Sequence, residues 1–442
     1  MAGRRSFGVG LIGFGTIGTG VVKLLRQQAR EIEARLGVAV RIVRVADLDT
    51  TTDRGVRLAK GVLGNDAGAL IADSRVDVVV ELIGGVEPAR TFIAEALDRG
   101  KHAVTANKAL LSSHGPELAR RAEAAGVVLG FEASVGGGIP VVRTLRESLA
   151  GDSNREIYGI VNGTANYILS EMSAGGGEFG EVLARAQAMG LAEADPSYDV
   201  EGVDSLHKLV ILVALAFGKR IRPGAVHVEG IRQISSTEIA YAKEFGYTIK
   251  LLAVARDTAD GVEARVHPSM VPDGHLLAKV SGPFNAVCIR GRALGTSIYY
   301  GQGAGMMPTA TAVVADLMEA ARALRDGRAP SVHPYGQALS ERSYTRVVPM
   351  GETSHEHYIR FSVADRPGVL AKISSILASE DIGIATVSQH DGSCRGAVPL
   401  VMRTYRTPDS AMSRALARVS KLKESKAKPV VLRVEERLGE GD

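Results

Sequence analysis

One stretch of the sequence combines a lysine with several acidic residues at short spacing. The stretch runs from Ala186 to Lys208 and contains Glu193, Asp199 and Asp204. A proline and a glycine within it predict a helix end, a turn and a new helix, so that the acidic groups can converge. Asp204 and Lys208 are four residues apart and therefore share one side of the new helix. Lysine and carboxylate groups at such a site can carry protons, whereas the alternative is a solvated i,i+4 ion pair worth a few tenths of a kcal/mol.

A second lysine stands where a parallel sheet binds its ligands. Lys108 ends the segment Val-Thr-Ala-Asn-Lys that begins at Val104 and includes Thr105. The segment follows a predicted strand, and ligands of open α/β sheets bind beyond the carboxyl ends of the strands. We therefore expect Lys108 near a bound nucleotide, the alternative being a solvated lysine at the start of a helix.

A glycine-rich turn follows the first predicted strand and opens a helix. In such a turn the first glycine permits a sharp bend of the backbone, and the second lets a pyrophosphate approach the backbone closely. The third lets the helix pack against the strand. The pattern alone is weak, because any tight strand-to-helix turn can produce it, but its place in a βα array predicts dinucleotide binding. The turn consists of Gly13, Phe14, Gly15, Thr16, Ile17 and Gly18.

The end of the second predicted strand bears on the choice of nucleotide. Asp47 can accept hydrogen bonds from the ribose and would repel a 2′-phosphate, which favours NAD. Three basic residues nearby could accommodate NADP instead, namely Arg44, Arg54 and Lys60.

The elements that must position these residues form an α/β fold. Apolar segments alternate with helical patterns, which predicts a parallel, doubly wound, Rossmann-like sheet over residues 1–131. The strands are expected at 7–12, 41–46, 76–83, 102–105 and 127–131. The third of these is nearly continuous in β-branched residues, as in a strand covered by helices on both faces.

The rest of the chain is predicted to form two further domains. A glycine cluster opens an α+β domain at residues 132–325 for catalysis, substrate binding and dimerisation, and a polar stretch with three prolines at 326–355 is expected to be a linker. Residues 356–437 show a βαββαβ pattern.

Composition excludes several classes of protein. The chain has 442 residues with a formal charge of +4, too little for a broad surface against nucleic acid. Its longest apolar run is far shorter than the roughly 20 residues of a membrane-spanning helix. Two widely separated cysteines and a start without a signal-like segment favour a reducing, cytoplasmic location.

The stretch from Ala186 to Lys208 resembles the signature of homoserine dehydrogenases, and the resemblance extends over nearly the whole chain. It implies the NAD(P)-dependent interconversion of L-homoserine and L-aspartate 4-semialdehyde in threonine, methionine and isoleucine biosynthesis. A partly desolvated lysine near another cation can exchange protons near neutral pH. Lys208 is then the acid/base, and Lys108 is its electrostatic partner.

The resemblance also assigns the substrate, cofactor and cation contacts. Homoserine's ammonium group would meet Glu193 and Asp204, with Asp199 in support. The remaining assignments are substrate contacts at Gly163 and Thr164, backbone cofactor contacts at Gly190 and Gly303, and a Na⁺ or K⁺ site at Glu132, Val135, Gly137 and Ile139.

The tail resembles an ACT domain, a small amino-acid-sensing module that usually pairs with another copy. The resemblance implies threonine as an inhibitory effector and a homodimer or higher oligomer formed through ACT domains. The residues that carry it are Asp365, Gly368, Val369, Leu370 and Gln389.

Two other functions fit parts of the sequence. An aspartate-semialdehyde dehydrogenase shares the nucleotide turn but needs a nucleophilic cysteine, and neither Cys288 nor Cys394 lies in a matching context. A non-catalytic sensor of dinucleotide and amino acid leaves the lysine and its acidic neighbours unexplained.

Overall fold

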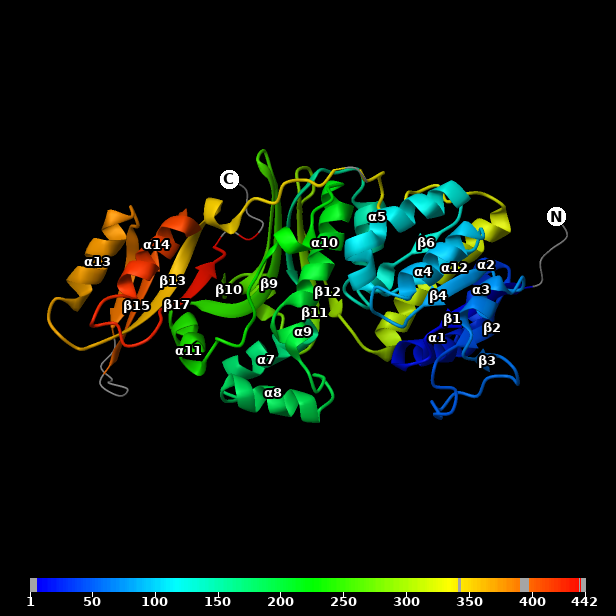
Figure 1. Cartoon of the computed structure of the whole chain (residues 1–442), viewed down its shortest axis with the longest axis horizontal. Helices are drawn as coiled ribbons and strands as arrows, with labels where there is room; N and C mark the ends of the chain where they lie inside the picture. The colour runs from blue at the N-terminus through cyan, green and yellow to red at the C-terminus, as the bar shows by residue number, and fades with distance from the viewer. Residues whose placement is uncertain (1–5, 341–342, 390–396, 437, 439–442) are drawn as a thin grey trace. The chain divides into compact units, whose positions relative to one another are not determined.

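The computed structural model describes residues 6–340, 343–389, 397–436 and 438 (Figure 1). The chain divides into two compact units, each assembled from separate stretches of sequence. The first unit contains Met1–Gly163, Val203–Pro223 and Pro283–Thr345, and the second contains Thr164–Gly202, Gly224–Gly282 and Arg346–Asp442.

The amino-terminal part of the first unit is a parallel sheet with the order β3-β2-β1-β4-β5-β6. The order reverses at β1 and β4, as in doubly wound dinucleotide-binding domains, and this confirms the predicted fold class. The two-residue strand β3 was not predicted, because so short a segment has no readable periodicity. The strands are β1 Ser6–Ile12, β2 Ala39–Ala46, β3 Leu63–Gly64, β4 Val78–Glu81, β5 His102–Thr105 and β6 Leu129–Gly130.

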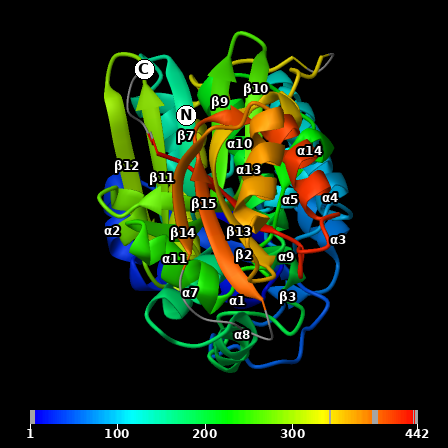
Figure 2. The same ribbon diagram turned by 90° about the vertical axis from the view of Figure 1, so that its left-hand side faces the viewer.

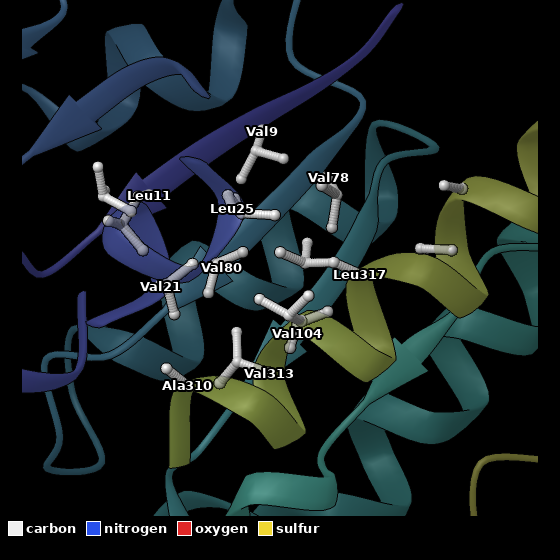
Figure 3. Close-up of a cluster of buried hydrophobic side chains, with 14 of the residues drawn as sticks. Val9, Leu11, Val21, Leu25, Val78, Val80, Val104, Ala310, Val313 and Leu317 are labelled. Carbon is white, nitrogen blue, oxygen red and sulfur yellow. The ribbon is translucent and has the colours of Figure 1, made fainter. Parts of the chain in front are cut away.

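Apolar side chains from strands and helices form the core of this sheet. Figure 3 shows valines and leucines of β1, β4 and β5 packed against side chains of α1 and α12. Val9, Val80 and Leu317 are fully buried in this core. The helices of this part are α1 Thr16–Gln27, α2 Ala29–Leu36, α3 Ala67–Ala72, α4 Ala89–Asp98, α5 Lys108–Ala125 and α12 Met306–Asp326.

Helix α12 comes from a region that the sequence places in the second domain, yet its apolar face packs on the amino-terminal core. The polar stretch after it also packs in part, since Tyr335 is 1% exposed and its ring lies 5.0 Å from that of Phe131. The compact units are therefore discontinuous, whereas the predicted domain boundaries are continuous.

The first unit also contains an antiparallel group of strands in the order β12-β11-β7. Helix α10 packs against β7 and against α5, and this places the two helices that carry the predicted lysines side by side. The elements are α6 Val141–Arg143, a π-helical turn Thr144–Ser148, β7 Asn154–Ile160, α10 Val203–Phe217, β11 Phe284–Gly291 and β12 Gly295–Gln302, with 3-10 turns Glu132–Ser134 and Pro223–Ala225.

The second unit is built on a sheet in the order β9-β10-β17-β13-β15-β14, and Figure 2 shows its carboxyl-terminal strands with α13 and α14. β8 pairs with β10, and β16 pairs with β13. Its strands are β8 His227–Val228, β9 Tyr247–Thr258, β10 Gly261–Pro272, β13 Ser354–Val363, β14 Ile384–Gln389, β15 Val398–Thr404, β16 Thr407–Pro408 and β17 Val430–Val434. Its helices are α7 Gly163–Ser173, α8 Phe179–Ala188, α9 Ser197–Val200, α11 Ser236–Glu244, α13 Val369–Ser379 and α14 Asp409–Val419, with 3-10 turns Leu276–Lys279 and Met350–Glu352.

The carboxyl-terminal module has the predicted order β13, α13, β14, β15, α14, β17. Residues from both helices, such as Ile373 and Met412, share one core with Phe361 and Met402 of the strands. Among the described residues, no helix combines the length and the apolar composition that a membrane span requires.

Candidate active site

The glycine turn after β1 has the geometry that its sequence predicts. Gly13 has φ +97°, and a Cβ there would lie 2.8 Å from the carbonyl carbon of Leu82. A Cβ on Gly18 would lie 2.3 Å from the carbonyl oxygen of Gly13. The fold itself therefore requires glycine at both positions, as a tight turn and a close helix-to-strand contact demand.

Gly15 differs, because a Cβ there would meet nothing within 4 Å. It is exposed and forms the N-cap of α1 without a side-chain cap. The first N–H groups of a helix have no partners within the helix and attract anions. This open face fits the pyrophosphate of a dinucleotide.

Asp47 lies directly beside the glycine turn. Its Oδ2 accepts the backbone N–H of Phe14, and its Oδ1 accepts that of Asp49 at 2.8 Å. Arg54 extends a guanidinium over the Phe14 ring, 5.1 Å from the ring centroid, and its Nη2 lies 3.5 Å from Oδ1 of Asp47. A carboxylate that suits NAD and a cation that suits NADP thus stand at the same end of the turn.

Polar side chains also organise the carboxyl edge of β4 and β5. The buried Glu81 accepts the hydroxyl of Thr105 at 2.6 Å and the backbone N–H of Ile83 at 2.8 Å. Asn107 donates its amide to the carbonyl of Gly85 and caps α5, whose first residue is Lys108. Sequence reasoning missed Glu81 and Asn107, although a carboxylate that ends a fully apolar strand was a readable signal.

The two predicted lysines meet at one carboxylate. Lys208 Nζ donates to Asp204 Oδ2 at 2.7 Å and to the carbonyl of Val161 at 2.6 Å, while Lys108 Nζ lies 3.1 Å from Asp204 Oδ1. Asn162 donates its amide to Asp204 Oδ2 at 2.8 Å. Asp204 is 3% and Lys208 is 8% exposed, so the pair is not a solvated ion pair on a helix surface.

Both lysines change the ionisation of Asp204. Burial opposes ionisation of Asp204, but the two lysines outweigh it and lower the pKa of Asp204 to about 2. Lys108 and Lys208 therefore both act on one carboxylate, in a largely buried place. Such a place suits a substrate oxygen that gains negative charge.

A histidine adjacent in sequence to Lys208 ties the two lysine helices together. His207 on α10 forms a 2.6 Å hydrogen bond through Nδ1 with the hydroxyl of Ser112 on α5. Burial lowers the pKa of His207. The bond fixes the spacing of α5 and α10, and sequence reasoning had no signal for it because the partners are 95 residues apart.

The predicted cation loop packs against the predicted cofactor loop at Gly303. The Glu132 carboxylate accepts the backbone N–H groups of Val142 at 2.9 Å and Arg143 at 2.8 Å. A Cβ on Gly137 would lie 2.4 Å from the carbonyl oxygen of Gly303. Gly303 is itself buried, and a Cβ there would lie 2.0 Å from the amide of Asn285. Close packing therefore requires glycine at position 303, and loop flexibility is not the reason for it.

The buried carboxyl group of Asp316, which contacts this loop, is expected to make the stability of the protein depend on pH. Its Oδ2 accepts the Glu132 N–H at 2.8 Å, and burial together with the Glu132 charge raises the pKa of Asp316 from 3.8 to about 7. Because the pKa of Asp316 is higher in the folded chain than in the unfolded chain, protonation of this carboxyl group favours the folded state. That stability is lost as the pH rises between the two values. The substitution Asp316→Asn keeps an accepting oxygen but removes the charge. We expect it to shift the free energy of unfolding in the stabilising direction by about 1–3 kcal/mol more at pH 8 than at pH 5. Denaturant unfolding at both pH values measures this, and an equal effect at both contradicts it.

Several predicted substrate and cofactor residues belong to the second unit. Glu193 and Gly190 are exposed, Asp199 is half-buried on α9, and Thr164 donates its hydroxyl to the carbonyl of Leu191 at 2.8 Å. Gly190 has φ +70°, with open space around a Cβ. Their roles toward the substrate and the cofactor stay predictions.

The predicted effector residues lie at the start of α13 and at the end of β14. Gly368 is the N-cap of α13 in the left-handed conformation, with φ +86°. Asp365 and Leu370 are exposed, Val369 is buried in the module core, and Gln389 ends β14 in an exposed position.

A doubly wound sheet with an open glycine turn, in the same unit as a buried lysine–carboxylate cluster, defines an NAD(P)-dependent oxidoreductase. Comparison with protein families agrees with this class. Residues 140–318 match the homoserine dehydrogenase family, residues 13–132 match the homoserine dehydrogenase NAD binding domain, and residues 357–424 match the ACT domain.

Individual relatives are similar over nearly the full length. A homoserine dehydrogenase of Neisseria gonorrhoeae is 42% identical, covering 94% of this chain and 95% of the relative. The solved structure of a homoserine dehydrogenase from Thiobacillus denitrificans is 41% identical with a TM-score of 0.91, covering 99% and 100% of the two chains. A hyperthermophilic archaeal homoserine dehydrogenase in complex with NADPH is 25% identical with a TM-score of 0.61, covering 71% and 97%. The chain belongs to the homoserine dehydrogenase family, whose enzymes act in amino-acid biosynthesis.

The aspartate-semialdehyde dehydrogenase alternative is thereby set aside, and the structure adds a physical reason. Cys288 is 0% exposed, and burial raises the pKa of its thiol to about 12. A thiolate nucleophile is not available there at neutral pH. Cys394 lies outside the described residues.

Proposed function

We propose that Lys208 is the general acid/base in the oxidation of L-homoserine to L-aspartate 4-semialdehyde. The observation that supports this most directly is the burial of its ammonium group between Asp204 and the Val161 carbonyl. When bound, the nicotinamide of NAD(P) accepts the hydride from the hydroxyl-bearing carbon of homoserine. Lys208, as the neutral amine, takes the hydroxyl proton as the C–O bond becomes a carbonyl, and as the ammonium returns a proton to that oxygen in the reverse direction.

Lys108 supports the same oxygen by charge. It pairs with Asp204 Oδ1 on the side opposite the Lys208 contact, and its side chain is 33% exposed. We assign to it electrostatic stabilisation of the alkoxide-like oxygen. Thr105 and Asn107 hold the turn before it and fix where its helix begins.

The ammonium group of the substrate needs carboxylates. Glu193 is exposed, and its side chain forms no hydrogen bond or ion pair with the part of the chain that the structure describes, whereas Asp204 already contacts both lysines and Asn162. We therefore assign the ammonium group chiefly to Glu193, with Asp199, Gly163 and Thr164 completing the substrate site.

The glycine turn from Gly13 to Gly18 would bind the pyrophosphate, with Gly190 and Gly303 as further backbone contacts. Asp47 supports NAD, while Arg54 and the NADPH complex of the archaeal relative support NADP. Na⁺ or K⁺ would bind the carbonyl-rich loop of Glu132, Val135, Gly137 and Ile139, because alkali cations prefer oxygen ligands.

Asp47→Asn tests the nucleotide preference. The amide keeps an oxygen for the Phe14 N–H but loses the charge that opposes a 2′-phosphate. We expect the ratio of kcat/KM for NAD to that for NADP to fall about tenfold, which corresponds to about 1.4 kcal/mol. Asp49→Asn, at the neighbouring exposed carboxylate, is the matched control, and an unchanged ratio in Asp47→Asn rejects the role.

The ACT module supports regulation by an amino acid. We propose that threonine binds near Asp365, Gly368 and Gln389 and inhibits, that ACT modules pair in a homodimer or higher oligomer, and that the enzyme acts in the cytoplasm. The first experiment is homoserine-dependent reduction of NAD and NADP, each with and without threonine and with Na⁺ or K⁺ as the only alkali cation. Absence of turnover with both nucleotides overturns the proposed reaction.

A further inference from the structure

A second cluster of ionisable side chains lies in the second unit and takes no part in the proposed reaction. His355 and His357 alternate on β13, so both imidazoles point to one face of the strand. Asp409, the first residue of α14, faces them. The three residues are 4%, 1% and 6% exposed, and their ligand atoms lie within 4.8 Å of one another.

The two imidazoles converge on one atom. His355 Nδ1 and His357 Nε2 each lie 2.9 Å from Asp409 Oδ1. The opposite ring atoms, His355 Nε2 and His357 Nδ1, are buried and have no hydrogen-bond partner in the described part of the chain. Each imidazole therefore directs its polar contact to the Asp409 side.

The surrounding charges leave the carboxylate available to a cation. Arg433 donates to Asp409 Oδ2 at 2.7 and 3.0 Å and to Glu229 Oε1 at 2.9 Å. Since Arg433 is shared between Asp409 and Glu229, it neutralises Asp409 only in part. The arginine also fixes the carboxylate so that Oδ1 faces the two rings, which is how residues behind a metal ligand orient it.

We propose that His355, His357 and Asp409 bind a divalent transition-metal ion, with Zn²⁺ preferred. Two imidazole nitrogens and one carboxylate oxygen are a donor set that Zn²⁺ favours, with water as the fourth ligand. Arg433, which contacts Asp409, and Glu229 also line a groove of about 790 Å³. The ion would hold β13 to the start of α14 and so stabilise the carboxyl-terminal module.

A double substitution separates metal binding from simple hydrogen bonding. In His355→Asn with His357→Gln, the amide nitrogens replace Nδ1 and Nε2 as donors to Asp409, but amides are poor ligands for Zn²⁺. The full chain, without an affinity tag, is stripped with a chelator and titrated with Co²⁺, whose visible absorption reports a low-symmetry site, and then with competing Zn²⁺. His114→Asn with His275→Asn is the matched control for the loss of two histidines elsewhere.

We expect one equivalent of metal per wild-type and control chain, and a rise in Tm on saturation with Zn²⁺. The His355→Asn, His357→Gln chain should bind at least about 100-fold more weakly and show no rise in Tm, while its homoserine oxidation stays at the wild-type level. Equal metal affinity in wild type and this variant overturns the proposal, as does a wild-type chain that binds neither ion. In the latter case the cluster is a metal-free hydrogen-bonded clamp.

Discussion

Replacement of Lys208 by alanine is expected to lower kcat by about 100-fold or more while the affinity for the nucleotide stays near that of the wild type. The magnitude is that of a lost general acid/base, and we expect the nucleotide to be spared because Lys208 lies on α10, whereas the glycine turn joins β1 and α1. Steady-state kinetics and nucleotide binding by fluorescence titration measure the two quantities separately.

The pH profile distinguishes proton transfer from a structural role. The pKa of Asp204 is about 2, and burial lowers that of His207, so neither changes charge between about pH 7 and pH 10. A limb of the kcat profile in that range that disappears in Lys208→Ala therefore belongs to the lysine. Lys208→Arg keeps a cation beside Asp204 but cannot release a proton, and we expect the same loss of kcat with an unchanged Tm.

Lys372→Ala is the control for loss of a lysine elsewhere, because Lys372 forms an exposed ion pair with Glu424 far along the sequence from the site. Turnover close to wild type in Lys208→Ala would exclude the acid/base role. A parallel fall of kcat and Tm in both Lys208 variants would instead indicate that the lysine only holds α10 to the Val161 carbonyl.

The sequence predicted the amino-terminal sheet well because its strands are almost purely apolar and its helices amphipathic. It could not place α12, since an apolar helix shows that it is buried but not which core it enters. The same limit applies to Asp204 and Lys208, whose spacing is equally typical of a surface pair. Burial distinguishes the two cases, and burial depends on α5 and β7, which lie far away in sequence.

The cluster at His355, His357 and Asp409 escaped sequence reasoning for a related reason. The histidines are separated by one residue, but the aspartate follows more than 50 residues later, so no local spacing suggests a site. Glu81 and Asn107 were missed although they end or follow buried strands. Polar residues at the carboxyl ends of parallel strands therefore merit as much attention as the glycine turn between them.

Gly15→Val is expected to raise KM for the nucleotide by about 100-fold or more, equivalent to about 2.7 kcal/mol, without unfolding the protein. The reason is specific to this glycine. A Cβ at Gly15 has no neighbour within 4 Å, and the residue has φ −71°, which valine can adopt. The added methyl groups therefore occupy only the space over the α1 N-terminus that the pyrophosphate would need.

Two other glycines make the result interpretable. At Gly18 a Cβ would lie 2.3 Å from the Gly13 carbonyl oxygen, so Gly18→Ala should lower Tm together with nucleotide affinity. Gly151→Val adds the same side chain at another glycine with open space around its Cβ and should change neither quantity. If Gly15→Val retains wild-type KM at wild-type Tm, the pyrophosphate does not lie on this turn and the nucleotide must bind elsewhere on the sheet.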